Sequence, residues 1–281
     1  MPLTPTREIV HNARESGVGV GAFNVIQIEH AQAIVAGAEA VKLPVILQIS
    51  ENTVRYHGSL EPIGLAALAV ARAAQVPVAL HLDHAESAQL VRQAAALGFT
   101  SVMFDGAKLP YEENVTATKD ITAYCHARDV FVEAELGEIG GKDGAHAPGV
   151  RTDPDEAREF VAATAVDSLA VAVGSSHAML TRDAVLDFGL IGRLREAVSV
   201  PLVLHGSSGV DDAGLAEAVR AGMTKINVST HLNKAFTRAV REYLAVHAQA
   251  ADPRTYLGPA RDSVTAEVAR LLRVFKGPEQ S

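Results

Sequence analysis

Three histidines of this chain stand where hydrophobic runs end. His84, His177 and His205 each follow a short apolar stretch that is typical of a buried strand. A single histidine in such a place is usually a structural residue, but three of them predict one metal site assembled from distant parts of the chain. Imidazole ligands without cysteine favour zinc or a similar first-row ion. Three protein ligands also leave one coordination position open, which is typical of a catalytic site.

Carboxylates occur at the same kind of position. Asp83 directly precedes His84, and Asp105 and Glu135 each lie near the end of a further apolar run. We expect Asp83 to be a proton-transfer group, with a role as the outer partner of a histidine ligand as the alternative. Asp105 and Glu135 are expected either to orient histidine ligands or to form a second, weaker metal site. The simpler alternative for both is a structural carboxylate bonded to the backbone or to a lysine.

Two small polar turns predict an anion site. Their polar and flexible residues are Gly206, Ser207 and Ser208 in the first turn and Asn227, Ser229 and Thr230 in the second. Each turn leads into a predicted helix, so backbone N–H groups and a helix N-terminus can approach a phosphate closely. A metal, a phosphate site and a free carboxylate together indicate metal-assisted chemistry on a phosphorylated sugar, with the metal as a Lewis acid on a carbonyl.

Alternating strands and helices must position these residues. Short apolar strands that alternate with helices predict a parallel sheet that is closed into a barrel or covered on both faces. We expect strands over residues 18–25, 44–50, 78–84, 101–106, 130–137, 168–174, 201–206 and 225–230. Eight such units in roughly 250 residues favour one (β/α)8, or TIM, barrel domain spanning residues 1–281. An open, doubly wound sheet is the runner-up, but no Gly-x-Gly-x-x-Gly turn follows the first strand.

Four further segments complete the expected α/β architecture. An extra N-terminal helix over residues 3–14 precedes the barrel, and a C-terminal helix over residues 262–274 closes the chain. Residues 51–58 are expected to form a loop, and residues 182–198 a helix. In such barrels the carboxyl ends of the strands carry function, which is where the histidines and carboxylates stand.

Composition limits the class of protein. Hydrophobic residues make up 48% of the chain and charged residues 21%, which excludes a disordered chain. The net charge of -8 argues against nucleic-acid binding. The lone Cys125 excludes an intramolecular disulfide framework and fits a reducing compartment. We see no signal peptide and no apolar run of the ~18 residues that span a bilayer, so we expect a cytoplasmic protein without a membrane partner.

Taken together, the motifs resemble those of the class II, zinc-dependent ketose-bisphosphate aldolases, the fructose- and tagatose-bisphosphate group. The resemblance covers nearly the full length. It rests on residues 22–25, 81–84, 103–106, 133–137 with the pair 140–141, 167–174, 201–206 and 225–228. It implies a TIM barrel that reversibly cleaves a ketose 1,6-bisphosphate to dihydroxyacetone phosphate and an aldehyde.

The resemblance also implies residue roles. His84, His177 and His205 become the zinc ligands, and Asp83 becomes the acid/base that takes the C4 hydroxyl proton in cleavage. The remaining matches are Asp105 and Glu135 at an alternative metal site, Gly206, Ser208, Asn227, Ser229 and Thr230 at the C1-phosphate site, and Asn24 and Ser50 near the sugar. The family usually also binds a monovalent cation, Na+ or K+, near the phosphate, and forms homodimers or homotetramers.

Three positions depart from the family pattern. Where the mobile loop normally carries a glutamate that exchanges the C3 proton, Asp143 is the nearest substitute. Ala178 follows the second zinc histidine in place of the usual glycine, and Gly258 stands where an arginine often reaches the second phosphate. Candidates to replace that arginine are Arg55, Arg254 and Arg261.

Other functions fit the sequence less well. A Schiff-base aldolase needs a lysine at the end of a central strand, whereas Lys225 begins its predicted strand. A barrel that binds a phosphosugar without cleaving it fits the altered loop around Asp143. A metal-dependent hydrolase accounts for the histidines but leaves the phosphate turns unexplained. The sequence does not choose between fructose, tagatose and other phosphorylated ketoses.

Overall fold

The computed structural model describes residues 2–136, 151–176 and 181–277, and in these ranges eight parallel strands close a barrel. Each strand pairs with the next in sequence, and β8 pairs with β1. The strands are β1 Val20–Asn24, β2 Val45–Ser50, β3 Val78–Ala85, β4 Ser101–Phe104, β5 Phe131–Leu136, β6 Ser168–Val171, β7 Leu202–Leu204 and β8 Met223–Val228. The predicted (β/α)8 barrel is confirmed.

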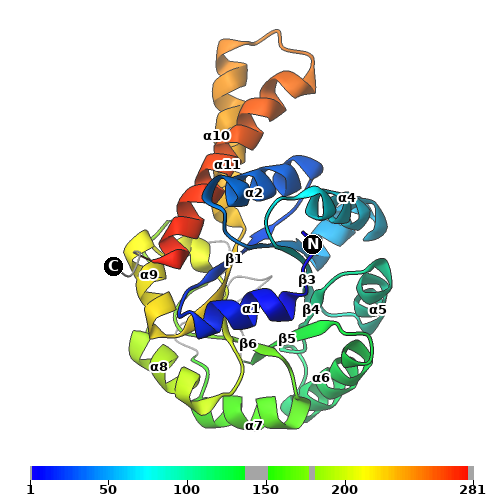
Figure 1. Ribbon diagram of the computed structural model, residues 1–281, viewed down its shortest axis with the longest axis vertical. Coiled ribbons are helices and arrows are strands. Elements are labelled where there is room, and N and C mark those ends of the chain that lie inside the picture. Colours follow the sequence, from blue (N-terminus) through cyan, green and yellow to red (C-terminus); the bar gives the residue numbers. More distant parts are fainter. Residues whose placement is uncertain (1, 137–150, 177–180, 278–281) are drawn as a thin grey trace.

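Helices surround the barrel (Figure 1). They are α1 Thr6–Glu15, α2 Ile28–Val41, α3 Glu51–His57, α4 Glu61–Ala73, α5 Ala88–Leu97, α6 Tyr111–His126, α7 Pro154–Thr164, α8 Phe188–Ala197, α9 Asp212–Ala221, α10 Thr230–Val246 and α11 Pro253–Lys276. The strands are buried along nearly their whole length because helices cover them outside and side chains fill them inside. The main hydrophobic core lies between strands and helices.

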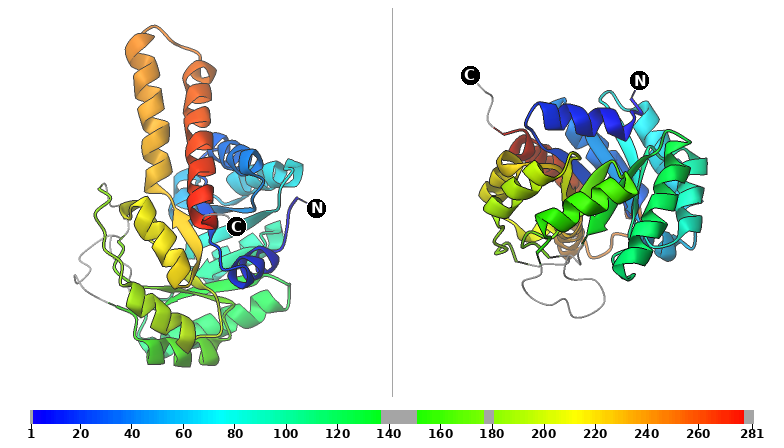
Figure 2. Two further views of the ribbon diagram at one scale, coloured as in Figure 1. Left: turned by 60° about the vertical axis from the view of Figure 1, so that its left-hand side comes forward. Right: turned by 90° about the horizontal axis from the view of Figure 1, so that it is seen from below.

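Helix α1 lies across the amino-terminal end of the barrel (Figures 1 and 2). Its apolar residues Ile9, Val10 and Ala13 form a separate small core with side chains near the starts of the strands, among them Val20 and Phe131. This amphipathic helix therefore plugs the end of the barrel opposite to the predicted site.

Three predicted element boundaries are wrong. Residues 51–57 form helix α3 instead of a loop, because the hydroxyl of Ser50 caps it by accepting from the N–H of Thr53 at 3.3 Å. Helix α8 begins at Phe188, where Asp187 caps it, and residues 182–187 are not helical. Helix α11 begins at Pro253, well before residue 262, because Asp252 caps it and proline suits the first turn.

Helices α10 and α11 extend as a pair far beyond the barrel (Figure 1 and the left view of Figure 2). The two helices contact each other, and α11 also packs on α2. Val246, the last residue of α10, is 77% exposed. Within the described ranges, no helix combines the length and apolar character needed to cross a membrane.

Candidate active site

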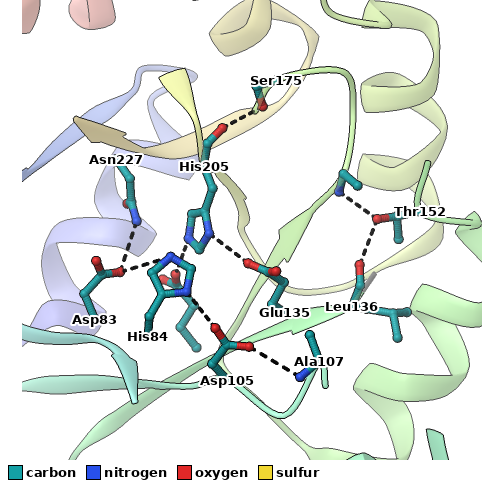
Figure 3. Close-up of polar contacts among 12 residues, drawn as sticks. Asp83, His84, Asp105, Ala107, Glu135, Leu136, Thr152, Ser175, His205 and Asn227 are labelled. Atoms are coloured by element: carbon teal, nitrogen blue, oxygen red, sulfur yellow. Dashed lines mark hydrogen bonds and ion pairs between the residues drawn. The ribbon is translucent and has the colours of Figure 1, made fainter. Parts of the chain in front are cut away.

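The barrel brings most of the described candidate residues to its carboxyl end (Figure 3). Asp83 and His84 come from β3, and His205 directly follows β7. One ligand atom of each of these three residues lies within 4.8 Å of the other two, and all three residues are buried. Two imidazoles this close together fit the ligands of one zinc or similar ion, with the carboxylate of Asp83 beside it. His177, the third predicted histidine ligand, lies outside the described residues, as does Asp143.

A local irregularity of β3 places Asp83 and His84 in one cluster. Successive residues of a regular strand point to opposite faces, which would separate the two side chains. Here the pairing of β3 with β4 shifts register between Leu82 and Ala85, and His84 has a φ of 50°, in the left-handed region. Such a backbone costs about 1–3 kcal/mol for a residue other than glycine. The chain therefore holds a strained conformation at the point where the site is built.

Asp105 orients the ring of His84. Its Oδ2 atom lies 2.8 Å from Nδ1 of His84, and its Oδ1 atom accepts from the N–H of Ala107 at 3.4 Å. With Nδ1 donating to the carboxylate, the lone pair of His84 is on Nε2. Nε2 lies on the side of Asp83, 3.9 Å from its Oδ1 (Figure 3). The arrangement is that of a metal-ligand histidine held by an outer carboxylate.

His205 lies between two carboxylates. Its Nδ1 is 2.9 Å from Oε2 of Glu135, and its Nε2 is 3.2 Å from Oε1 of Glu133. Burial lowers the pKa of His205, but the hydrogen bonds to Glu133 and Glu135 outweigh this and raise it to about 9. The ring centroids of His205 and His84 are 4.7 Å apart. Both imidazoles therefore border the same small volume.

Glu133 and Lys225 are two buried charged residues that the sequence reasoning did not place at the site. Lys225 Nζ lies 2.8 Å from Oε2 of Glu133 and 3.3 Å from Nε2 of His81. Burial raises the pKa of Glu133, but Lys225 and His205 outweigh it and hold that pKa far below the usual range. Sequence spacing could have indicated Glu133, because it stands two residues before Glu135 in a buried strand and alternate residues of a strand share a face.

Asp83 is an ionised carboxylate held by two amides. Burial raises its pKa, but the neighbouring His84 and His205 lower it, to about 2. The side-chain amides of Asn24 and Asn227 donate to its two oxygens at 3.3 and 3.5 Å. The carboxylate of Asp83 is therefore ionised and held in a fixed orientation.

The turn after β7 approaches another chain segment closely. Gly206 has a φ of 66°, and a Cβ atom there would lie 2.6 Å from the backbone of Ser176. Ser207 donates its hydroxyl to the carbonyl of Asn227, and Ser208 accepts from the N–H of His231 at 3.2 Å. These contacts join the turn after β7 to the end of β8.

The second predicted turn leads directly into α10. Ser229 is the N-cap residue of α10 and Thr230 is its first helical residue. Ser229 makes no side-chain cap bond. Within the described part of the chain, the buried Oδ1 of Asn227 has no hydrogen-bond partner. A buried acceptor beside Asp83 is suited to a hydroxyl of a bound ligand, because an unpaired polar atom is unfavourable inside a protein.

Comparisons with known proteins agree with this geometry. The model of the family "Fructose-bisphosphate aldolase class-II" matches residues 4–280. A fructose-bisphosphate aldolase of Geobacillus stearothermophilus is 41% identical over 279 residues, which is 98% of this chain and 97% of that protein.

Solved structures give the same result. The YdjI aldolase of Escherichia coli K12 has 34% identity and a TM-score of 0.87, with 97% of each chain covered. A putative fructose-1,6-bisphosphate aldolase of Coccidioides immitis has 32% identity and a TM-score of 0.85, with 96% of each chain covered. The chain therefore belongs to the class II fructose-bisphosphate aldolase family.

Proposed function

We propose that this class II aldolase carries out reversible, zinc-dependent cleavage of a ketose 1,6-bisphosphate to dihydroxyacetone phosphate and an aldehyde. The observation that supports it most directly is the buried cluster of Asp83, His84 and His205 at the carboxyl end of the barrel. Membership of the aldolase family supplies the reaction type. Fructose, tagatose and related bisphosphates are the substrates to be compared.

His84 and His205 would hold the metal, and we assign His177 as the third ligand. When bound, the ion supplies a Lewis acid for the substrate carbonyl oxygen and stabilises the negative charge that develops there. Nε2 is the nitrogen of His84 that would bind the ion, because Nδ1 donates to Asp105. Glu135, 2.9 Å from Nδ1 of His205, is placed to line an alternative position of the ion.

Asp83 is the proposed proton acceptor for the C4 hydroxyl. In cleavage, the hydroxyl proton moves to the Asp83 carboxylate, the C3–C4 bond breaks, and C4 becomes the aldehyde carbonyl. The electron pair of that bond goes to C3 and is delocalised into the C2 carbonyl, and C3 then takes up a proton. We assign this last exchange to Asp143. In condensation, protonated Asp83 returns its proton to the new C4 oxygen.

The phosphate on C1 is assigned to the turns after β7 and β8, through Gly206, Ser207, Ser208, Ser229 and Thr230. The turns are held together by the contacts between Ser207 and Asn227 and between Ser208 and His231. The N-terminus of α10 adds a favourable dipole for an anion. We place the monovalent cation, Na+ or K+, beside this phosphate.

Asn24 and Ser50 are assigned to the sugar side of the site. Asn24 donates to Asp83 and accepts from Gln48 at 2.6 Å, so its amide is fixed. Ser50 ends β2 beside Asp83. Arg55, one turn into α3 and bonded to Glu51 at 2.7 Å, is our candidate for the second phosphate. Arg254 instead pairs with Asp252 at the start of α11, in the extended helix pair.

A cleavage assay on a panel of ketose phosphates tests the function. We expect release of dihydroxyacetone phosphate, loss of activity with EDTA, and recovery with zinc. Full activity in metal-free protein, or trapping of a substrate on a lysine by borohydride, would overturn it. Zinc binding without turnover of any bisphosphate would favour a phosphosugar-binding barrel.

An Asp83→Asn variant tests the proton acceptor. Asparagine keeps the size of the side chain but cannot accept the C4 hydroxyl proton, so we expect kcat to fall by about 10²–10⁴-fold. Stoichiometric zinc binding is expected to persist, because Asp83 is not one of the proposed ligands. An unchanged kcat would remove Asp83 from its proposed role.

We also propose that the chain forms a homodimer or homotetramer. The support is the pair of helices α10 and α11, which extends beyond the barrel (Figure 2). Val246 at the end of α10 is also exposed. A pair of helices that projects from a domain offers a surface on which a second copy of the chain can pack. Light scattering of the purified protein measures the mass directly, and a monomer at micromolar concentration would contradict this.

A further inference from the structure

We propose that Lys225 and Glu133 form a buried ion pair that positions His205 as a metal ligand. The two are positioning residues, because they act on the metal centre through His205. The inference rests on the proposed function in one respect, namely that His205 binds the metal. It assigns a role to the two charged residues inside the barrel that the mechanism above does not use.

Glu133 bridges the lysine and the histidine. One carboxylate oxygen, Oε2, accepts from Lys225 Nζ at 2.8 Å, and the other, Oε1, lies 3.2 Å from Nε2 of His205. The hydroxyl of Ser168 also donates to Oε2, at 3.4 Å. The side chains of Glu133 and His205 are 0% exposed and that of Lys225 is 1% exposed. The contact is thus shielded from water.

The bridge determines which nitrogen of His205 faces the metal. The ammonium group of Lys225 can only donate, so the carboxylate of Glu133 accepts from it. The same carboxylate is therefore also the acceptor in its contact with Nε2 of His205. Nε2 of His205 then donates its N–H to Glu133 whether or not an ion is bound. Without an ion Nδ1 donates to Glu135, so Nδ1 is the nitrogen that would exchange its proton for the ion. Nδ1 lies beside Glu135, the carboxylate two residues nearer the end of β5. In His84 the two nitrogens are used in the opposite way, since Asp105 holds Nδ1.

Lys225 is itself fixed from the other side of the barrel. A second N–H of its ammonium group points to Nε2 of His81 at 3.3 Å, so that nitrogen must be an acceptor. Nδ1 of His81 therefore carries the proton and donates to the hydroxyl of Ser101 at 2.8 Å. That hydroxyl also accepts from Thr6 of α1 at 2.7 Å. A continuous line of hydrogen bonds thus joins the plug helix to the metal ligand.

The ion pair has a physical consequence for metal binding. A buried carboxylate without a counter-charge is strongly unfavourable, so Lys225 allows an ionised Glu133 to lie against His205. An imidazole that donates to a carboxylate is held in one orientation and is a more basic ligand. Loss of such an outer partner lowers metal affinity by about 10–100-fold in other sites.

Metal affinity tests this independently of turnover. We would measure the zinc Kd by competition with a chromophoric chelator, and the visible spectrum of the Co2+-substituted protein. Wild type would be compared with Lys225→Met and Glu133→Gln. We expect each variant to bind zinc about 10–100-fold more weakly and to change the Co2+ absorption bands. Wild-type affinity and spectrum in both variants would overturn the proposal.

The chain offers a matched control. Asp167 is also a carboxylate that bridges a cation and an imidazole, Arg7 at 2.7 Å and His126 at 2.8 Å, but it lies near the plugged end of the barrel. Asp167→Asn is expected to leave zinc affinity within about twofold of wild type, because its trio does not reach a ligand. An equal loss of affinity in this control would show a general effect of destabilisation and would overturn the proposal.

A double variant covers the case in which single variants fail to fold. Glu133→Gln with Lys225→Met removes both charges at similar volume, which buried sites often tolerate. We expect circular dichroism to report a folded protein with weaker zinc binding than wild type. Wild-type affinity in the double variant would overturn the proposal. If wild type binds zinc but cleaves no ketose bisphosphate, the proposed function fails while the weakened binding of the variants still supports the positioning role.

Discussion

Two carboxylates of this barrel make the same set of contacts in opposite surroundings. Glu133 of β5 bridges Lys225 and His205 at 2.8 and 3.2 Å, and Asp167, just before β6, bridges Arg7 and His126 at 2.7 and 2.8 Å. The first trio is wholly buried. In the second, the side chains of Arg7 and His126 are 52% and 36% exposed.

The two trios differ in their exposure to solvent and not in their contact distances. Water screens an exposed pair, which typically contributes about 0–1 kcal/mol. Breaking a buried pair by removing one partner costs about 3–5 kcal/mol, because it leaves a charge without compensation in a low dielectric. The exposed trio fastens α1 and α6 to the barrel, whereas the buried trio ends on a proposed metal ligand. The same chemistry therefore serves attachment in one place and positioning in the other.

The largest effect on stability is expected from Lys225→Met. The substitution removes the ammonium group and leaves two buried carboxylates, those of Glu133 and Glu135, on the single imidazole of His205. We therefore expect the free energy of unfolding to fall by about 3–5 kcal/mol. Urea unfolding of the metal-free protein measures it. The double variant with Glu133→Gln should recover most of the loss, because no isolated charge remains. A loss below about 1 kcal/mol in the single variant would mean that water reaches the pair, and the contrast between the trios would disappear.

The next effect concerns alkaline pH in the metal-free protein. The pKa of His205 is raised from 6.5 to about 9, so its proton stabilises the fold fully below pH 6.5 and is lost as the pH rises through 9. We expect the free energy of unfolding to decline across this window by on the order of 3 kcal/mol, at about 1.4 kcal/mol per pH unit.

Denaturant unfolding at a series of pH values measures this decline. The Glu133→Gln variant is the control, because it weakens the hydrogen bond that raises the pKa of His205, and its profile should be shallower. A flat wild-type profile through the window would show that His205 is neutral when the metal is absent.

The two trios also differ in how far the sequence predicts them. The eight strands, and the placing of Asp83, His84 and His205 at their carboxyl ends, follow from apolar runs that each end in a polar residue. Such a pattern is local in the sequence. A parallel barrel brings the carboxyl ends of all its strands to one end, so residues at those ends lie close together. The closeness of the candidate residues could therefore be inferred before the structure.

The inner charged pair could not be inferred in that way. Lys225 lies early in β8, and its side chain meets Glu133 of β5 inside the closed barrel, although β5 and β8 are not neighbouring strands. Register between distant strands is a tertiary property that no local pattern encodes. The register shift at His84 is not predictable from the sequence for the same reason, because a local apolar pattern indicates a regular strand.

Helix α3 was not predicted, and the reason is local. Residues 51–57 lack a clear apolar period, and several of their side chains are exposed. The helix is short, and its start depends on one hydrogen bond from the N–H of Thr53 to the hydroxyl of Ser50. Residue patterns predict long amphipathic helices well, but a single cap gives too little signal for a helix of this length.

The smallest expected effect is that of Arg7→Met, the counterpart of Lys225→Met in the exposed trio. Arg7 loses its ion pair with Asp167 and its position over the ring of Phe131, 5.8 Å from the centroid. Methionine retains part of the packing against that ring. Asp167 keeps its bonds to His126 and to the N–H of Val132, both at 2.8 Å, so its carboxylate still has hydrogen-bond partners.

We therefore expect the free energy of unfolding to fall by about 1 kcal/mol or less in Arg7→Met, and zinc affinity to stay unchanged. Raising the salt concentration to about 1 M should shrink even this difference, because it shortens the Debye length to about 3 Å. The effect of Lys225→Met should be nearly insensitive to the same salt, since ions do not enter the barrel. Urea unfolding of both variants at low and high salt measures this, and equal salt sensitivity would show that burial does not distinguish the two carboxylates.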